Sequence, residues 1–310
     1  MRICVTGATG VIGQRLLGAL HDAGAAHDVT VLSRDPVRAS SKLGAIGARP
    51  AQAFAWEAST EPAPAEALAG RDAVVHLAGE RIDQRWSAKA KRAIWESRVL
   101  GTRNLIAGLA GVEPRPQTLV SASAIGYYGS RGEEPLDEEA PAGSGFLAQT
   151  CVAWEQEAQR ARSLDMRVVA IRTGVVLDMA GGALKSMLPA FRLGLGGPVA
   201  GGRQYMSWIH HADLVQIMLA ALADGRWSGA VNATAPEPVS NRTFSRALGR
   251  ALRRPALMPV PALALRAVYG EMSSVITSSA RVMPAKALVL GYGFLHPQLD
   301  EALRAALARG

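Results

Sequence analysis

Three glycines that follow the first apolar segment constrain this chain most. The stretch "RICVTGATGVIG" places Gly7, Gly10 and Gly13 at G-x-x-G-x-x-G spacing, directly before residues with helical apolar spacing. Gly7 permits a tight turn, Gly10 lets the backbone approach a pyrophosphate, and Gly13 lets helix and strand pack closely. The helix N-terminus favours anions, because free N–H groups and the helix dipole point at them. A strand, this loop and a helix predict a dinucleotide-binding unit; the alternative is a plain glycine-rich turn.

Short apolar segments alternate with amphipathic ones as far as Leu177. We expect strands in "RICVT", "DVTVLSRD", "AFAW", "DAVVHLAG", "QTLVSASA" and "RVVAIRTGVVL", and long helices in "SAKAKRAIWESRVLGTRNLIAGLA" and "FLAQTCVAWEQEAQRARSL". This alternation predicts an α/β fold with a Rossmann-type, doubly wound parallel sheet. Glycines and prolines cluster after Leu177, which indicates a smaller lobe that closes over the sheet edge. We therefore expect a Rossmann domain in 1–177, with returning segments from 203–235, and a substrate lobe in 178–310 that includes a C-terminal module at about 255–305.

The composition excludes several other classes of protein. The 310 residues carry a net charge of +8, but arginines are interleaved with acidic residues and no basic run carries aromatics. A solvated surface with an anionic cofactor site therefore fits better than nucleic-acid binding. Cys4 and Cys151 form no disulfide or metal pattern, and we expect no metal. No signal-peptide pattern and no stretch of about 18 apolar residues is present, so we expect a cytoplasmic protein that binds no membrane. Its partner would be a small-molecule substrate; the oligomeric state stays open, with a homodimer as the candidate.

The end of the second strand decides between cofactors. An Asp or Glu there would bind the ribose 2′-hydroxyl of NAD, but this strand ends in Ser33 and Arg34. A hydroxyl and a guanidinium suit a 2′-phosphate instead, which predicts NADP(H). Asp35 comes one place too late to be the NAD-type acid. The alternative for Arg34 is a solvated surface residue.

Several further motifs carry a family resemblance. With the loop and "HLAG" stand "SRVLGT" (97–102), "SASAIGYYG" (121–129), "FRLGLGGPVAGGRQYMSWIHHADL" (191–214) and "VMPAKALVLGYGF" (282–294). Over nearly its whole length the chain resembles the extended short-chain dehydrogenase/reductase superfamily. Within it, the chain is similar to an epimerase-like subgroup with a small C-terminal module, the YfcH-type and 39U proteins. The resemblance implies an NADP-dependent oxidoreductase or a nucleoside-sugar-epimerase-like enzyme of unknown substrate.

The resemblance also implies which residues contact the cofactor. Residues 7–13 and 33–34 would hold its phosphates, 77–79 would line its adenosine side, and 172–177 would run past the nicotinamide. Arg98 stands where many members carry an Asn. The implied contacts are Gly7, Thr9, Gly10, Val11, Ile12, Ser33, Arg34, Leu77, Ala78, Gly79, Arg98, Ser121, Thr173 and Gly174.

One stretch departs from the superfamily pattern. In "GFLAQTCVAWE" (145–155), Leu147 and Cys151 occupy the positions of the usual Tyr and Lys. Leu147 cannot transfer a proton, and Cys151 cannot supply a fixed positive charge. Four residues apart on a helix, they predict one apolar face. The fold and cofactor carry over by resemblance, but the reaction does not. The alternative function is a non-catalytic protein that binds or senses NADP(H).

A substitute proton donor is expected at the end of the strand "QTLVSASA". Ser123 falls at the Ser/Thr of the usual Ser-Tyr-Lys set, and Tyr127 and Tyr128 follow it. Ligands bind at such strand ends, so one of the three hydroxyls is the candidate acid. The alternative for Tyr128 is packing in the turn. Cys151 fits a buried structural thiol better than a nucleophile, because the local sequence offers no cation to lower its pKa.

Two residues are candidates for substrate contact. His210 precedes a helix that Asp213 is expected to cap, and Arg203 could pair with an anionic substrate group. The alternatives are a hydrogen-bonded structural histidine and a surface arginine. Trp56 and Glu80 could border the adenine, although Trp56 fits the core better.

Overall fold

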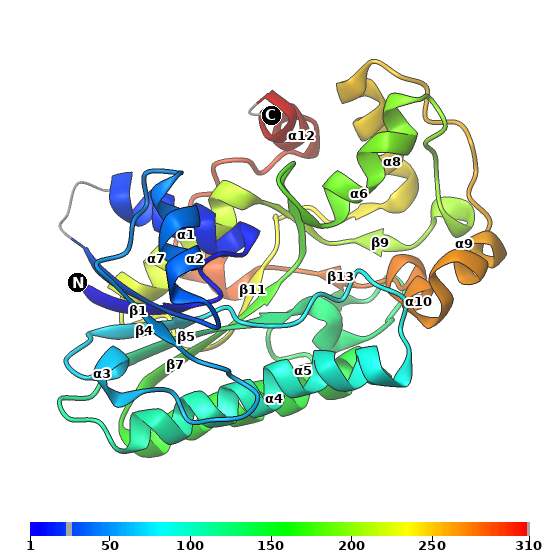
Figure 1. The fold of residues 1–310 in the computed structure, drawn as a ribbon. Helices are drawn as coiled ribbons and strands as arrows, with labels where there is room; N and C mark the ends of the chain where they lie inside the picture. The colour runs from blue at the N-terminus through cyan, green and yellow to red at the C-terminus, as the bar shows by residue number, and fades with distance from the viewer. Residues whose placement is uncertain (23–26, 309–310) are drawn as a thin grey trace.

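A single parallel sheet forms the centre of the molecule. The structure is a computed structural model that describes residues 1–22 and 27–308. Seven strands lie in the order β11-β7-β5-β4-β1-β2-β3, and every neighbouring pair is parallel (Figure 1). They are β1 (Arg2–Thr6), β2 (Asp28–Ser33), β3 (Gln52–Ala55), β4 (Ala73–His76), β5 (Thr118–Ala124), β7 (Arg167–Thr173) and β11 (Gly229–Ala233). The predicted doubly wound Rossmann-type sheet is confirmed.

The strand order reverses beside β1. The chain runs outward from β1 through β2 to β3 and then places β4 on the other side of β1. Ligands of open α/β sheets bind at the carboxyl ends of the strands beside such a reversal. The fold therefore directs attention to the ends of β1 and β4, where the predicted glycine loop begins.

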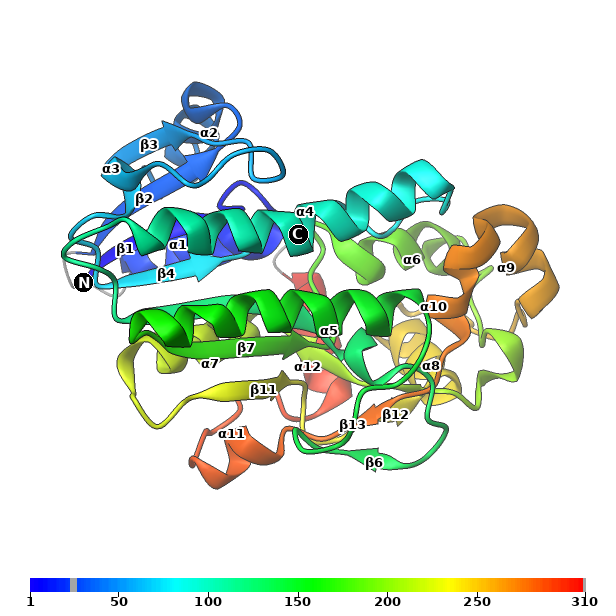
Figure 2. The same cartoon turned by 90° about the horizontal axis from the view of Figure 1, so that it is seen from below.

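Helices cover both faces of the sheet. One face carries two long helices that lie side by side in Figure 2, together with a short one. These are α3 (Ala65–Leu68), α4 (Ala88–Ala110) and α5 (Phe146–Gln159). The helices on the opposite face are α1 (Val11–Asp22), α2 (Pro36–Gly44), α7 (His211–Ala223) and α11 (Ala285–Val289). The central strands are apolar on both sides because both faces are covered.

The segment "RVVAIRTGVVL" is not one strand, contrary to the sequence-based expectation. It divides at Gly174 into β7 and β8 (Val175–Leu177), and β8 leaves the sheet to pair with β10 (Trp208–His210). The physical reason is a close approach: a Cβ at position 174 would lie 2.6 Å from the carbonyl oxygen of Ser207. The glycine lets the chain change direction here, and sequence periodicity alone does not reveal it.

A smaller lobe lies beyond the carboxyl ends of the strands, at the right of Figure 1. Its apolar interior is formed by side chains such as Leu188, Phe244 and Leu303. Its helices are α6 (Gly182–Arg192), α8 (Asn241–Leu252), α9 (Ala262–Tyr269), α10 (Ser273–Thr277) and α12 (Leu299–Ala308). Its short strands include β9 (Tyr205–Met206), β12 (Val239–Ser240) and β13 (Arg281–Val282), which pairs with β6 (Pro135–Leu136). Short 3-10 turns are η1 (Ile125–Tyr128), η2 (Arg160–Leu164), η3 (Ala200–Gly202) and η4 (Gly270–Met272).

The C-terminal segment connects the lobe to the sheet. The carboxylate of Asp213 on α7 accepts the N–H groups of Leu295 at 2.7 Å and His296 at 3.0 Å, and the Tyr292 hydroxyl at 3.0 Å. The expectation that Asp213 caps α7 is therefore wrong. The cap is His210, whose Nδ1 accepts the N–H of Ala212 at 3.2 Å. Within the described ranges, no helix combines the length and apolar character needed to cross a bilayer.

Candidate functional site

The loop between β1 and α1 requires glycine at two positions. Gly7 has a φ of +69°, and a Cβ there would lie 2.6 Å from the carbonyl carbon of Leu77 at the end of β4. A Cβ at Gly13 would lie 2.5 Å from the carbonyl oxygen of Gly7, so a side chain there would push α1 away from the loop. Gly10 is exposed, and its N–H donates to the Gly7 carbonyl at 3.0 Å. The loop thus turns sharply below the N-terminus of α1, where a pyrophosphate would meet backbone rather than side chains.

The residues after β2 leave a free guanidinium. Asp35 is the N-cap of α2, and its carboxylate accepts the N–H of Arg38 at 2.9 Å. That carboxylate caps the helix, and Asp35 lies one residue beyond the position at which an acid would bind the ribose of NAD. Arg34 is exposed, and no described residue forms an ion pair with it. Beside the Ser33 hydroxyl, this guanidinium suits an added phosphate group.

Lys42 is a charged residue of this region that sequence reasoning missed. From α2 its Nζ donates to the carbonyl oxygen of Thr9, in the glycine loop, at 2.8 Å. It therefore places a second positive charge between the loop and the end of β2. No motif marks this lysine, because only the packing of α2 beside the loop brings it there.

A buried histidine joins the loop to β4 and α4. His76 Nδ1 lies 2.7 Å from the Thr6 hydroxyl, and its Nε2 lies 3.0 Å from the Thr102 hydroxyl. The Thr6 hydroxyl also accepts the N–H of Ala78 at 3.2 Å. A neutral imidazole satisfies this pattern, with Thr6 donating to Nδ1 and Nε2–H donating to Thr102. Burial lowers the pKa of His76 to about 4, so the ring stays neutral at physiological pH.

The first turns of α5 face the end of β5. A Cβ at Gly126 would lie 3.3 Å from the Leu147 Cβ and 3.8 Å from the Cys151 Sγ, so both side chains border the same strand end. Burial, together with the Glu155 carboxylate, raises the pKa of the Cys151 thiol to about 12. The fold does bring cations near it, Arg98 first among them, but they do not offset burial. The thiol is therefore protonated at neutral pH, and neither Leu147 nor Cys151 takes the proton-transfer role of the usual Tyr.

Two of the three candidate proton donors belong to a buried polar network. The Ser123 hydroxyl donates to Glu155 at 2.6 Å, and Glu155 forms an ion pair with Arg172 at 2.9 Å. The Tyr128 side chain is fully buried; its hydroxyl donates to Asn232 at 2.7 Å and accepts from Arg172 at 2.9 Å. Burial raises the pKa of Tyr128 to about 12. These contacts favour a structural role for Ser123 and Tyr128.

Tyr127 lies at the edge of the same network. Its ring covers the guanidinium of Arg172, with 3.5 Å between the guanidinium carbon and the ring centroid. The side chain is half-buried, and its hydroxyl has no hydrogen bond to any residue that the structure describes. Of the three candidates, Tyr127 is the one whose hydroxyl the protein does not hold.

The candidate substrate residues differ in exposure. Arg203 is exposed directly after η3, as a substrate-binding arginine on a loop would be. His210 is 1% exposed, and its ring lies between those of His211 at 4.3 Å and His296 at 4.0 Å between centroids. With Nδ1 capping α7, His210 has the environment of a structural histidine.

The remaining sequence-based candidates fall along the same sheet edge or in the core. Ser121 is buried on β5, and Thr173 is half-buried at the end of β7. A Cβ at Gly181 would lie 2.6 Å from a methyl of Val11, so the chain after β8 passes against the start of α1. Trp56 is 3% exposed and donates to the Glu61 carbonyl, which places it in the core. The glycine loop and the ends of β2, β4, β5 and β7 therefore meet at one edge.

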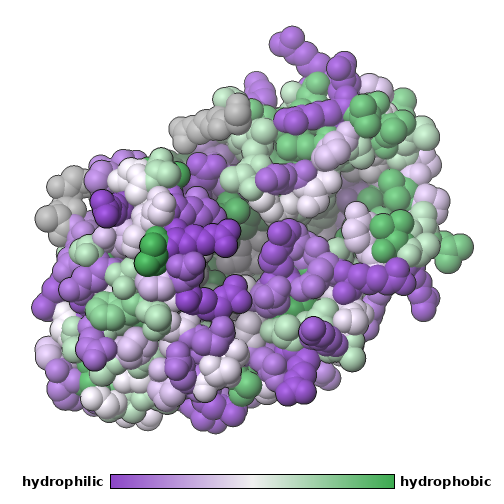
Figure 3. All heavy atoms as spheres, in the orientation of Figure 1, coloured by the Kyte–Doolittle hydropathy of each residue, from purple (hydrophilic) through white to green (hydrophobic). Residues whose placement is uncertain are grey.

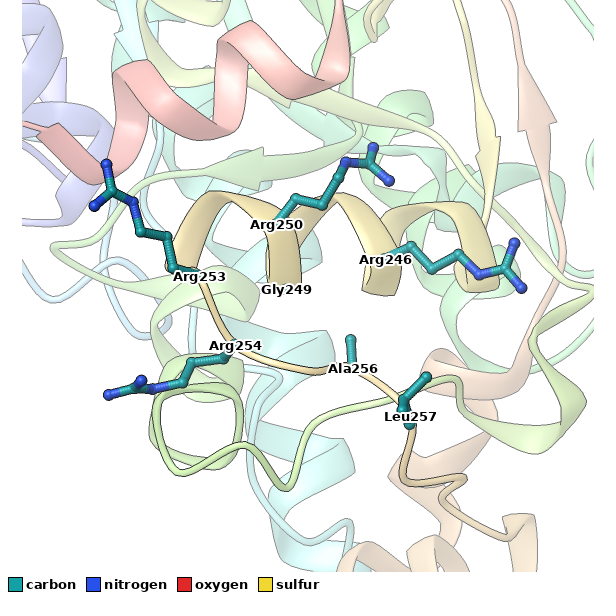
Figure 4. A pocket seen from close by; sticks show the side chains of 7 residues that line it. All are labelled: Arg246, Gly249, Arg250, Arg253, Arg254, Ala256 and Leu257. Atoms are coloured by element: carbon teal, nitrogen blue, oxygen red, sulfur yellow. The ribbon is translucent and has the colours of Figure 1, made fainter.

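The molecular surface has a hollow in this region. Figure 3 shows it in the middle of the face, between the part that carries the glycine loop and the smaller lobe. A separate depression of about 340 Å³ lies on α8, lined by Arg246, Gly249, Arg250, Arg253, Arg254, Ala256 and Leu257. Figure 4 shows its arginine side chains pointing in different directions rather than toward one point. This depression is therefore not a convergent anion site. Among the described residues, no three His, Cys, Asp or Glu side chains are grouped to hold a metal ion.

Sequence comparison shows the family of proteins to which this chain belongs. Residues 3–233 match the model of the NAD dependent epimerase/dehydratase family, and residues 260–306 match a domain of unknown function, DUF1731. The chain belongs to the NAD dependent epimerase/dehydratase family, as its resemblance to extended short-chain dehydrogenase/reductases implied.

Individual relatives narrow the comparison to one subgroup. The chain is 39% identical over 310 residues to "Epimerase family protein SDR39U1 homolog, chloroplastic" of Arabidopsis thaliana, covering 99% of this chain and 87% of that protein. It is 34% identical to "Epimerase family protein SDR39U1" of Homo sapiens, covering 99% and 100%. The crystal structure of human epimerase family protein SDR39U1 (isoform 2) with NADPH superposes with a TM-score of 0.87 at 32% identity, and each chain is covered fully. The predicted subgroup and its C-terminal module are confirmed.

Proposed function

We propose that this protein binds NADP(H) across the carboxyl edge of the sheet and transfers hydride as an NADP(H)-dependent oxidoreductase. The observation that carries the proposal is the glycine loop, which opens its backbone to a pyrophosphate while Arg34 and Lys42 place positive charge beside it. The human relative crystallised with NADPH supports the choice of cofactor. Two free cysteines, Cys4 and Cys151, fit the reducing conditions of the cytoplasm that we propose as its location.

The residues present fit a bound dinucleotide phosphate. Residues 7–13 would hold the pyrophosphate, and Ser33 and Arg34 would hold the 2′-phosphate. The Ala78 N–H is committed to Thr6, so the end of β4 offers a fixed wall to the adenosine side rather than a free donor. When bound, the nicotinamide would supply or accept a hydride. The chain's own residues bind and orient it, and α5 contributes an apolar surface instead of a proton.

A carbonyl substrate would still need a proton. Leu147 and Cys151 cannot supply it, and the hydroxyls of Ser123 and Tyr128 are held inside the protein. We therefore propose Tyr127 as the acid for such a substrate, supported by its free hydroxyl and its place just beyond β5. Arg203, exposed at the lobe, is the proposed contact for an anionic substrate group.

A second candidate function is binding or sensing of NADP(H) without turnover. The observation in its favour is the replacement of the usual Tyr and Lys by Leu147 and Cys151, which removes the proton donor from α5. NADPH oxidation with a broad panel of aldehydes and ketones separates the two functions. Turnover with any of them supports the enzyme, whereas tight NADPH binding with no oxidation by any member supports the sensor.

The choice of cofactor is tested by calorimetry with NADPH and NADH. We expect tighter binding of NADPH, and we expect Arg34→Ala to weaken NADPH on the order of 10-fold or more while NADH changes little, because only NADPH carries the extra phosphate. Arg92→Ala is the control, since Arg92 is an exposed arginine on α4 that pairs with Glu96. Equal affinities of the unmodified protein for both cofactors would overturn the preference.

A further inference from the structure

Arg98 on α4 holds its guanidinium in place with only part of its hydrogen-bonding capacity. Its Nη1 donates to the carbonyl oxygens of Glu80 at 2.9 Å and Ile94 at 3.1 Å. Within the described ranges, neither Nη2 nor Nε donates to another protein group. An arginine has five N–H donors in a rigid fork, so this one is fixed by the backbone and keeps donors for a ligand.

The guanidinium bridges the gap between β4 and α5. A Cβ at Gly79, just beyond β4, would lie 3.3 Å from the guanidinium carbon, so the end of β4 approaches it directly. On the other side the guanidinium lies 5.2 Å from the ring of Trp154 on α5. Trp154 is three residues beyond Cys151 on α5, and the Arg98 charge lowers the pKa of the Cys151 thiol, so the guanidinium lies near the residue at the usual Lys position. A positive charge is therefore present next to position 151, although it comes from a different helix.

This cation has no carboxylate within ion-pair distance among the described residues. Burial lowers the pKa of Arg98, and the interactions with Cys151 and then Glu80 offset this only in part. A largely buried charge without a partner is unfavourable, yet arginine stays protonated in proteins. An electron-rich ligand beside it would complete the environment of the guanidinium.

We propose that Arg98 supplies from α4 the fixed positive charge that a lysine at position 151 would have supplied from α5, and that it holds the nicotinamide half of the bound cofactor. The inference rests on the proposed NADP(H) function and adds to it the side of the cofactor that Arg98, an implied contact by resemblance, would hold and the charge that it would replace. Because an arginine does not release its proton, Arg98 orients the cofactor and does not act as an acid. Glycine at position 79 favours this arrangement, since a Cβ there would come within 3.3 Å of the guanidinium carbon.

The first test compares two ligands by calorimetry. NADPH contains the nicotinamide half, whereas adenosine 2′,5′-bisphosphate lacks it. Arg98→Met should weaken NADPH on the order of 10- to 100-fold, as expected for a charged hydrogen bond, and leave the bisphosphate within about 2-fold. Arg98→Lys should recover much of the NADPH affinity. Arg92→Met, at an exposed position of the same helix, should change neither affinity.

The second test moves the charge back to α5. In the Arg98→Met background, Cys151→Lys should restore NADPH affinity to within a few fold of the unmodified protein. Equal losses of NADPH and bisphosphate in Arg98→Met would assign Arg98 to the adenosine side and overturn the proposal, as would no loss at all. A folded double variant without recovery would also overturn it; if it does not fold, the single variants decide. Failure of the unmodified protein to bind either ligand would instead refute the proposed function.

Discussion

At the scale of single residues, Gly7 and Gly10 differ in what a side chain would meet. A Cβ at Gly7 would lie 2.6 Å from the backbone of Leu77, just after β4, and position 7 has a positive φ, so Gly7→Ala should prevent normal folding. A Cβ at Gly10 meets only the Gly7 carbonyl oxygen, at 3.2 Å, and otherwise points to open space. Gly10→Val should therefore fold, with a melting temperature within a few degrees of the unmodified protein, yet lose NADPH affinity by about 100-fold or more. Gly18→Ala on α1, where a Cβ meets nothing within 4 Å, is the control. Tight NADPH binding by Gly10→Val would show that this loop is not the site.

The two neighbouring tyrosines should respond differently to loss of their hydroxyls. Tyr128→Phe removes the buried donor to the Oδ1 of Asn232 and one buried acceptor of Arg172, and should destabilise the protein by about 1–3 kcal/mol in urea unfolding. Tyr127→Phe removes a hydroxyl that no described residue binds, so its stability should change by less than about 0.5 kcal/mol. With a carbonyl substrate, Tyr127→Phe should lower turnover on the order of 100-fold while NADPH binding stays unchanged. Unchanged turnover in Tyr127→Phe would exclude it as the acid.

At the scale of secondary-structure elements, the Glu155–Arg172 pair fastens α5 to β7. Both side chains are largely buried, at 12% and 5% exposure. Glu155→Ala would remove the carboxylate that pairs with the buried Arg172 guanidinium, so we expect a loss of about 3–5 kcal/mol in the free energy of unfolding. The exposed Arg92–Glu96 pair on α4 is the matched control, and Glu96→Ala should cost less than about 1 kcal/mol. Similar losses in both variants would contradict a structural role for the buried pair.

The His76 bridge between β1, β4 and α4 should make stability depend on pH. Its pKa in the folded protein is about 4, below the ordinary value of about 6.5. The folded state therefore disfavours the protonated ring. The neutral ring contributes about 3 kcal/mol at most to the free energy of unfolding. This contribution is present above pH 6.5 and is lost as the pH falls toward 4. His76→Gln cannot titrate, so its free energy of unfolding should fall less between pH 7 and 4.5 than that of the unmodified protein. Parallel curves would contradict this role for His76.

Elements with a strong local pattern could be predicted from the sequence. The glycine spacing and the apolar strands define the sheet and its loop, and α4 agrees with its expected segment because its amphipathic pattern is long. The division of "RVVAIRTGVVL" at Gly174 could not be predicted, because it depends on Ser207, which approaches from the lobe. Asp213 was misassigned for the same reason: a tail about 80 residues later supplies its donors.

The candidate site was predictable only where its residues lie in motifs. Gly7, Gly13 and the Ser33–Arg34 pair could be found by position. Lys42, the Glu155–Arg172 pair and the His76 bridge could not, because each depends on elements that meet only in the folded chain. The hydroxyls of Ser123 and Tyr128 could be identified in the sequence, but their hydrogen bonds to other side chains of the protein could not.

At the scale of the whole molecule, the net charge is distributed unevenly. Residues 1–178 contain 20 Lys and Arg and 20 Asp and Glu, whereas residues 179–310 contain 14 and 6. The entire excess of +8 therefore lies in the second part of the chain, most of which forms the lobe beside the hollow (Figure 1, Figure 3). A positive lobe next to the cofactor edge would attract an anionic dinucleotide, and the absence of nucleic-acid binding stays a prediction.

The central proposal is that this protein transfers hydride from NADPH although Leu147 and Cys151 replace the usual Tyr and Lys of α5. The most direct measurement is transfer of deuterium from NADPH labelled at nicotinamide C4 to members of a carbonyl panel, followed by mass spectrometry in the unmodified protein and in Cys151→Ala. We expect the label in at least one product, at rates within a few fold for the two proteins, because the Cys151 thiol is protonated and buried. Label transfer that disappears in Cys151→Ala, or bound NADPH that never releases its label to any acceptor, would contradict the account.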